Sequence, residues 1–173
     1  MDEAQQEAES GLEFASRTRF GLVVDILTGH LRLICALRNL TVELGSFDDG
    51  AFDEHVFQEH LEMDPRLANP TCVYWIRKLQ ARYFAGDYEG AVAAAAKAEP
   101  LLWTSPASFE IADYHFYAGL ACAAHLDTTP VGERYLHLEA LIAHHRQLEI
   151  WAKNCPENFE NRARASRRGD RPD

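Results

Sequence analysis

The chain has 173 residues, of which 47% are hydrophobic and 25% are charged, and its formal net charge is −10. This composition is typical of a globular domain with a sizeable core, and the negative charge argues against nucleic-acid binding by the folded body. No apolar run approaches the ~18 residues that a membrane-spanning helix needs, and the acidic start MDEAQQEAES does not resemble a secretory signal. A cytoplasmic protein with no membrane span is therefore predicted.

The first third of the chain predicts three helices. Residues 2–18 place alanines and Leu12 at helical spacing, and residues 20–41 carry a broad apolar face from Phe20 to Leu37. A loop at residues 46–50, SFDDG, precedes a shorter predicted helix over residues 51–63. Asp64-Pro65 ends that helix because a residue before proline resists the helical conformation.

Three similar start signals divide the rest of the chain. Asn69-Pro70, Ser105-Pro106 and Thr129-Pro130 each join a capping residue to a proline suited to the first turn of a helix. No alternating run of β-branched residues predicts a strand. The sequence therefore predicts an all-α fold of about seven helices arranged as antiparallel hairpins.

The stretch from 72 to 103, CVYWIRKLQARYFAGDYEGAVAAAAKAEPLLW, is the most informative. A glycine at position 86 can adopt a positive φ and end a helix without a Cβ clash, so Gly86 is predicted to mark a tight turn between two helices. The second helix carries small residues at helical spacing, which allow close approach of a neighbouring helix. These small residues are Ala91, Ala94, Ala95 and Ala98. The stretch predicts the helical hairpin of a repeat protein.

This hairpin resembles a tetratricopeptide repeat, whose turn and alanine positions are matched by Gly86, Asp87, Tyr88, Ala91 and Ala98. Two longer strings, FAGDYEGAVAAAAKAEPLLWTSPASFEIADYHFYAGLACAA and HLEALIAHHRQLEIWAKNCPENFENRA, resemble the helical-repeat segment of large bacterial hybrid sensor kinases. The resemblance implies a right-handed, TPR-like array over residues 1–161. It also implies a non-catalytic scaffold that couples a predicted ATPase region to GAF sensor and histidine kinase domains of the same protein.

A dense set of aromatic side chains with neighbouring cations has two interpretations. The first is packing between successive hairpins, and the second is a concave groove for a peptide or a partner helix, with cations at its rim. The candidate groove residues are Trp75, Arg77, Lys78, Arg82, Tyr83, Trp103, Tyr114 and Tyr117. The alternative function is a small-molecule sensor with a pocket between hairpins.

No catalytic or metal-binding constellation is found in the sequence. The chain lacks a GxxxxGK[ST] phosphate loop and the HRD and DFG elements of kinases. His137 and His144 share a helix face but lie about 10 Å apart along the axis, too far for one metal ion without a third element. The histidines are therefore expected to be structural, and no metal, cofactor or enzymatic activity is predicted.

Other polar residues also have structural explanations. Glu110 and Asp113 fall in the first turns of a predicted helix, where the helix dipole favours acids. Asp48 and Asp49 are expected to be loop or capping residues. The four cysteines, at positions 35, 72, 122 and 155, have no CxxC spacing and are predicted to be free thiols that pack as small apolar residues.

The ends of the chain carry separate predictions. Residues 162–173, RARASRRGDRPD, lack large apolar side chains and are predicted to form a disordered basic tail. The terminal helices carry Leu12, Phe14, Ile150 and Trp151, and exposed apolar ends tend to pair. A weak homodimer through a terminal helix is therefore expected, besides contacts with flanking domains of the parent protein or with a peptide.

Overall fold

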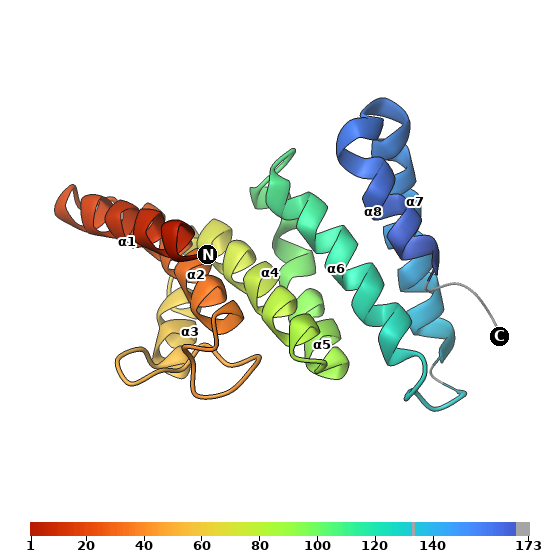
Figure 1. Ribbon diagram of the computed structural model, residues 1–173, viewed down its shortest axis with the longest axis horizontal. Helices are drawn as coiled ribbons and strands as arrows, with labels where there is room; N and C mark the ends of the chain where they lie inside the picture. Colours follow the sequence, from red (N-terminus) through yellow and green to blue (C-terminus); the bar gives the residue numbers. More distant parts are fainter. Residues whose placement is uncertain (133, 169–173) are drawn as a thin grey trace.

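The computed structural model describes residues 1–132 and 134–168, which form α-helices and short 3-10 helices and contain no strand (Figure 1). The α-helices are α1 (Asp2–Arg17), α2 (Gly21–Leu37), α3 (Glu54–Glu62), α4 (Ala68–Phe84), α5 (Tyr88–Ala98), α6 (Phe109–His125), α7 (Arg134–Asn154) and α8 (Pro156–Arg168). The 3-10 helices are η1 (Pro65–Leu67) and η2 (Glu99–Thr104). The prediction of an all-α fold is confirmed, with eight α-helices in the described residues.

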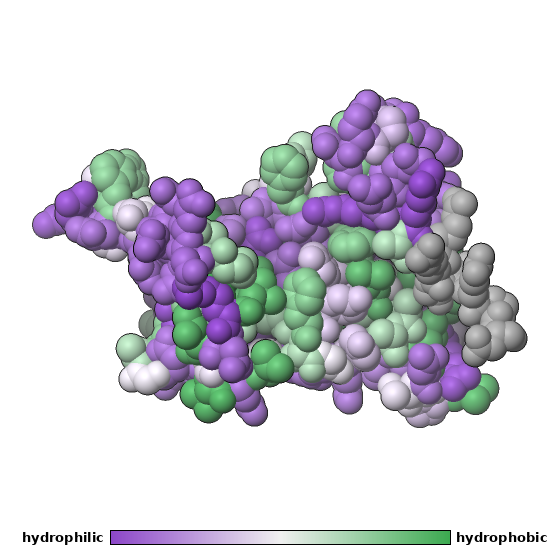
Figure 2. Space-filling view, viewed as in Figure 1, coloured by the Kyte–Doolittle hydropathy of each residue, from purple (hydrophilic) through white to green (hydrophobic). Residues whose placement is uncertain are grey.

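The helices follow one another across the molecule as a row of packed neighbours (Figure 1). Helix α1 packs on α2, α2 on α4, α4 on α5 and α6, α6 on α7, and α7 on α8. Hydrophobic side chains gather over α4 and α6 in the middle of the face shown in Figure 2, whereas α8 is mainly hydrophilic. Among the described helices, none is both long enough and apolar enough to cross a membrane.

Helix α4 is the centre of the core. Every residue from 70 to 81 is buried, because α2, α3, α5 and α6 all pack against this helix. The loop between α2 and α3 contributes Phe47, which is fully buried and packs edge-on against Tyr74 with ring centroids 5.7 Å apart. The core thus combines side chains of one central helix with an aromatic side chain from a polar loop.

The turn between α4 and α5 has the conformation predicted from Gly86. Gly86 has a φ of +77° and donates its N–H to the carbonyl of Tyr83 at 3.1 Å, while Asp87 donates its N–H to the carbonyl of Arg82 at 3.0 Å. These two bonds form a Schellman motif, which satisfies carbonyls at the helix end. Asp87 then caps α5 by accepting the N–H of Gly90 at 2.9 Å. The predicted small-residue stripe of α5 is buried at Ala91, Ala94, Ala95 and Ala98.

None of the three predicted capping residues caps the helix that it was predicted to start. Asn69 lies within the first turn of α4, and its Nδ2 donates to the hydroxyl of Ser105 at 2.6 Å. Thr129 donates its hydroxyl to the carbonyl of His125 at 2.8 Å, at the end of α6. Helices α6 and α7 begin later, at Phe109 and Arg134. These polar side chains bind residues elsewhere in the fold or the end of the previous helix, so the predicted helix starts were wrong by two to four residues.

The prediction of a disordered tail from residue 162 is wrong for residues 162–168, because α8 continues to Arg168. Arg162 forms an ion pair with Asp113 of α6 at 2.9 Å, and Ala163 and Ser166 are buried. Contacts with α6 and α7 thus stabilise a segment whose composition alone favours disorder. Residues 169–173 of the predicted tail lie outside the described residues.

Candidate functional site

Two adjacent cations of α4, Arg77 and Lys78, are buried, with 7% and 2% of their surface exposed. Their predicted position at the rim of an open groove is therefore wrong. The physical reason is that α4 is covered on all sides, so its charged side chains are placed inside the protein and paired there. Each cation is the centre of a separate ionic network.

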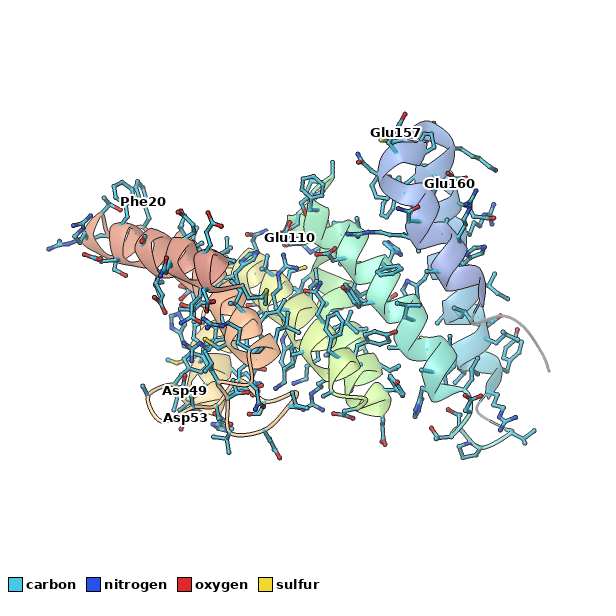
Figure 3. The ribbon with its side chains drawn as sticks, in the orientation of Figure 1. Phe20, Asp49, Asp53, Glu110, Glu157 and Glu160 are labelled. Atoms are coloured by element: carbon cyan, nitrogen blue, oxygen red, sulfur yellow. The ribbon has the colours of Figure 1, made fainter. Side chains whose placement is uncertain are left out.

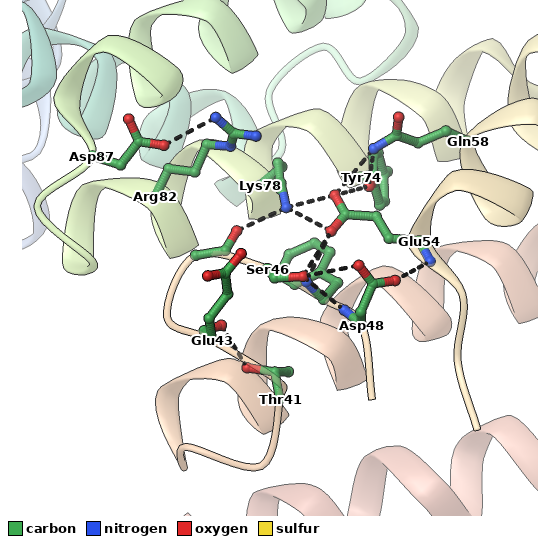
Figure 4. A network of polar contacts seen from close by, with 12 residues as sticks. Thr41, Glu43, Ser46, Asp48, Glu54, Gln58, Tyr74, Lys78, Arg82 and Asp87 are labelled. Carbon is green, nitrogen blue, oxygen red and sulfur yellow. Dashed lines mark hydrogen bonds and ion pairs between the residues drawn. The ribbon is translucent and has the colours of Figure 1, made fainter. Parts of the chain in front are cut away.

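The Lys78 network forms the floor of a polar pocket, which we call the loop pocket (Figure 4). The loop pocket lies between residues 43–48, the start of α3, and the side chains of Lys78, Arg82 and Asp87, and it has a volume of about 320 Å³. The predicted groove residues Lys78 and Arg82 and the predicted turn residue Asp87 therefore meet at the loop pocket.

Lys78 and Glu54 form a buried ion pair at the floor of the loop pocket. The Lys78 ammonium lies 2.5 Å and 2.7 Å from the two carboxylate oxygens of Glu54, and it donates to the carbonyl of Gly45 at 2.7 Å. Glu54 also accepts the N–H of Phe47 at 2.9 Å and the hydroxyl of Tyr74 at 2.8 Å. These bonds hold loop, α3 and α4 together.

Burial and the contact between Lys78 and Glu54 act in opposite directions on the pKa of each group. Burial by itself would raise the pKa of Glu54, but hydrogen bonds from Lys78 and from the N–H of Phe47 outweigh it and hold the pKa below its ordinary value. Burial lowers the pKa of Lys78, and its contact with Glu54 opposes that shift. Burial also raises the pKa of Tyr74, which keeps its hydroxyl protonated as a donor.

The rim of the loop pocket carries more acids than bases. Asp87 pairs with Arg82 at 2.9 Å, and Asp48 accepts the N–H of Glu54 at 2.7 Å as a loop residue, as predicted. The carboxylate of Glu43 makes no hydrogen bond or ion pair with another residue in the part of the chain that the structure describes. The rim thus offers a negatively charged group to an incoming molecule.

The Arg77 network lies between hairpins. Arg77 donates to Asp113 at 2.8 Å and to Glu110 at 3.1 Å, and Arg162 pairs with the other oxygen of Asp113. Figure 3 shows Glu110 at the start of α6. The imidazole of His30, more than the nearby Arg77, outweighs burial and lowers the pKa of Glu110 to about 2. This network links α2, α4, α6 and α8.

The aromatic residues of the predicted groove do not form one surface. Tyr83 and Tyr117 pack together with ring centroids 5.6 Å apart, between α4 and α6. Tyr114 is buried, Trp75 is buried beneath Lys97, and Trp103 is 74% exposed in η2. The eight predicted residues are therefore divided among the core, the Arg77 network, an inter-helix aromatic cluster, the loop pocket and a separate exposed position.

Two histidines meet in a way that sequence spacing could not predict. Nδ1 of His115 on α6 lies 3.1 Å from Nδ1 of His144 on α7. Burial lowers the pKa of each imidazole to about 4, so both rings are neutral near pH 7 and one Nδ1–H donates to the other ring. His137 instead packs against His125. Within residues 1–132 and 134–168, no three side chains of the metal-ligating types lie together.

The cysteines agree with the prediction from the sequence, whereas the loop residue Phe47 was not predicted to be buried. All four cysteines are free thiols, and burial raises the pKa of Cys72 and Cys122 to about 11. The residue that sequence reasoning missed is Phe47, whose signal was a single large aromatic within the polar segment SFDDG. Comparison of the chain with protein-family models, with curated protein sequences and with solved structures gave no match.

Proposed function

We propose that this chain is a non-catalytic, TPR-like interaction module of a cytoplasmic bacterial signalling kinase. In that role it would couple an ATPase region to sensor and kinase domains by binding a flanking domain or a peptide segment. A row of packed helices with a repeat-type turn at Gly86 between α4 and α5 supports the proposal, since stacked hairpins present extended surfaces to partners.

The observation that carries the proposal is the state of the charges at the loop pocket. Catalysis by side chains needs a nucleophile or base with a free site directed at substrate. Glu54, Lys78, Arg82 and Asp87 are instead held by one another and by backbone groups. A hollow in which these four charged groups have fixed partners is suited to recognition more than to chemistry.

The chemistry of the rim favours a basic partner segment. Glu43, Asp48, Glu54 and Asp87 line the pocket, against the cations of Lys78 and Arg82. The excess of carboxylates and the unpaired Glu43 side chain would attract a lysine or arginine side chain of the partner. The pocket volume of about 320 Å³ accommodates a side chain, with the rest of a peptide outside it.

The experiment is a peptide-array screen on the intact chain, followed by fluorescence-anisotropy titration of each hit. We expect lysine- or arginine-containing segments to bind, and Glu43→Lys to weaken binding by roughly tenfold or more. Glu13→Lys, an exposed charge reversal on α1, is the matched control and should bind like the parent chain. Equal binding by the Glu43 variant would contradict the proposed site.

The alternative function is a small-molecule sensor. A hollow of about 490 Å³ between α2 and α3 is partly lined by Leu22, Met63 and Leu67, and apolar hollows of this size suit small ligands. Thermal-shift screening with a metabolite library separates the two functions. A stoichiometric ligand whose binding is lost in Leu22→Asp, and not in Glu43→Lys, would favour the sensor.

A further inference from the structure

Helix α7 has a face that no other helix of the described residues covers. Its other side packs on α6 and α8, but Tyr135, Ile142 and Ile150 are 65%, 53% and 43% exposed. With Glu139, Ala143 and Arg146, they form what we call the outer face of α7. At about 100° per residue these six positions fall within one arc of roughly 100°. A hollow of about 530 Å³ runs along this face and is lined in part by Ile142, Ala143 and Ile150.

The order of residues on the outer face is symmetric about its middle. Glu139 and Arg146 lie equally far from the peptide between Ile142 and Ala143, and so do Tyr135 and Ile150. If two copies of α7 pack antiparallel about a two-fold axis at this point, equidistant residues on the two sides face each other. The apolar residues at 142 and 143 then meet at the centre.

This symmetry makes the face complementary to itself in charge. Glu139 of each copy faces Arg146 of the other, which gives two opposite-charge contacts, while Tyr135 faces Ile150 on both sides. Within the part of the chain that the structure describes, Arg146 makes no hydrogen bond or ion pair. The Glu139 carboxylate accepts only the hydroxyl of Tyr135, at 2.5 Å, and so retains further lone pairs.

We propose that two copies of this chain associate through the outer face of α7 as an antiparallel, two-fold symmetric helix pair. Residues 135–150 span about 22 Å of helix, and a single helix pair of that length buries less than the roughly 1,200 Å² typical of stable complexes. The dimer is therefore weak and concentration-dependent. The site is separate from the loop pocket, so this proposal stands or fails independently of the proposed function.

The test is sedimentation equilibrium of the full chain across a concentration series. We expect a monomer–dimer equilibrium with no larger species. Glu139→Arg and Arg146→Glu each convert both opposite-charge contacts into like-charge contacts. Each variant alone should therefore associate roughly tenfold more weakly or worse. An equimolar mixture of the two variants should recover association, because every contact in the mixed dimer again joins opposite charges.

The control is a charge reversal away from the outer face of α7. Arg17→Glu, an exposed reversal on α1, should leave the equilibrium unchanged. Circular dichroism should show that all variants keep their helical content, since the substituted side chains are exposed. A strict monomer at the highest soluble concentration would overturn the proposal. So would association that the mixture fails to restore, or growth beyond dimers, which would indicate a head-to-tail contact with another surface.

Discussion

Helices α4 and α7 show that position in the row of helices decides burial more than the hydrophobicity of a helix does. Helix α4 buries two cations, Arg77 and Lys78, because it has neighbours on every side. Helix α7 has 21 residues, yet only Leu141 and Leu148 are buried, and apolar side chains such as Ile142 are exposed. A charged residue inside α4 must therefore find a partner, whereas an apolar residue on α7 can remain uncovered.

The largest expected effect comes from breaking the ion pair inside α4. Lys78→Met leaves the Glu54 carboxylate buried without its cation, and removing one partner of a buried pair costs about 3–5 kcal/mol of unfolding free energy. Urea denaturation followed by circular dichroism measures the change. The double variant with Glu54→Gln should recover part of the loss.

The matched control for that variant is Lys153→Met, an exposed position near the end of α7. We expect a change within about 0.5 kcal/mol, as for most surface substitutions. If the two variants were equally stable, the contrast between a fully enclosed α4 and a half-covered α7 would be wrong.

The next effect concerns the buried side of α7, at the His115–His144 contact. An unfolded imidazole titrates near pH 6.5, whereas these two have a folded pKa of about 4. Between these values the unfolded chain binds more protons, so the stability is complete above pH 6.5 and decreases as the pH falls toward 4. We expect a loss of about 2–4 kcal/mol over this range, measured by urea unfolding at several pH values.

The variant His115→Leu/His144→Leu should flatten that dependence between pH 6.5 and 4. His55→Leu changes an exposed histidine and should leave the slope as it is in the parent chain. An unaltered slope in the double variant would show that other groups, such as the acids of the Arg77 network, cause the acid sensitivity.

A smaller effect is expected at the turn that follows α4. Gly86→Val places a β-branched side chain at a φ of +77°, which costs about 1–2 kcal/mol or more of unfolding free energy. A Cβ at this position meets no atom within 4 Å, so the cost comes from backbone conformation and not from a clash. Thermal unfolding of Gly86→Val and Gly86→Asn tests this origin of the cost. The asparagine variant should lose less stability than the valine variant, since asparagine tolerates positive φ better than valine.

The smallest effect on the monomer is expected on the outer face of α7. Ile142→Ser should change the unfolding free energy by no more than about 0.5 kcal/mol at low protein concentration, because the side chain is already exposed. Ile76→Ser in α4 is the opposite case, since Ile76 is fully buried, and it should destabilise by several kcal/mol. A large loss from Ile142→Ser in dilute solution would mean that α7 is covered within the monomer.

Much of the local structure was predictable from the sequence because its causes are local. Apolar spacing predicted the helices, and the predicted first two agree with α1 and α2 to within a few residues. The Gly86 turn and the alanine stripe of α5 were predicted correctly, since both depend on backbone conformation and side-chain size within one hairpin. The start signals at Asn69, Ser105 and Thr129 were misread because the same side chains can cap a helix or bind elsewhere.

Only the tertiary structure decided which charges are buried and what neutralises them. Lys78 and Glu54 are 24 residues apart in sequence, Arg77 and Asp113 are 36 apart, and His115 and His144 are 29 apart. The helical pattern around Arg77 and Lys78 is compatible with a solvated face, and burial follows from the helices that happen to pack on α4. In the same way, the helical tail of α8 depends on Asp113 and His145, which the local composition of residues 162–168 does not reveal. Local propensities thus determine the helices, whereas long-range partners determine which faces of those helices are buried and which remain open to a partner.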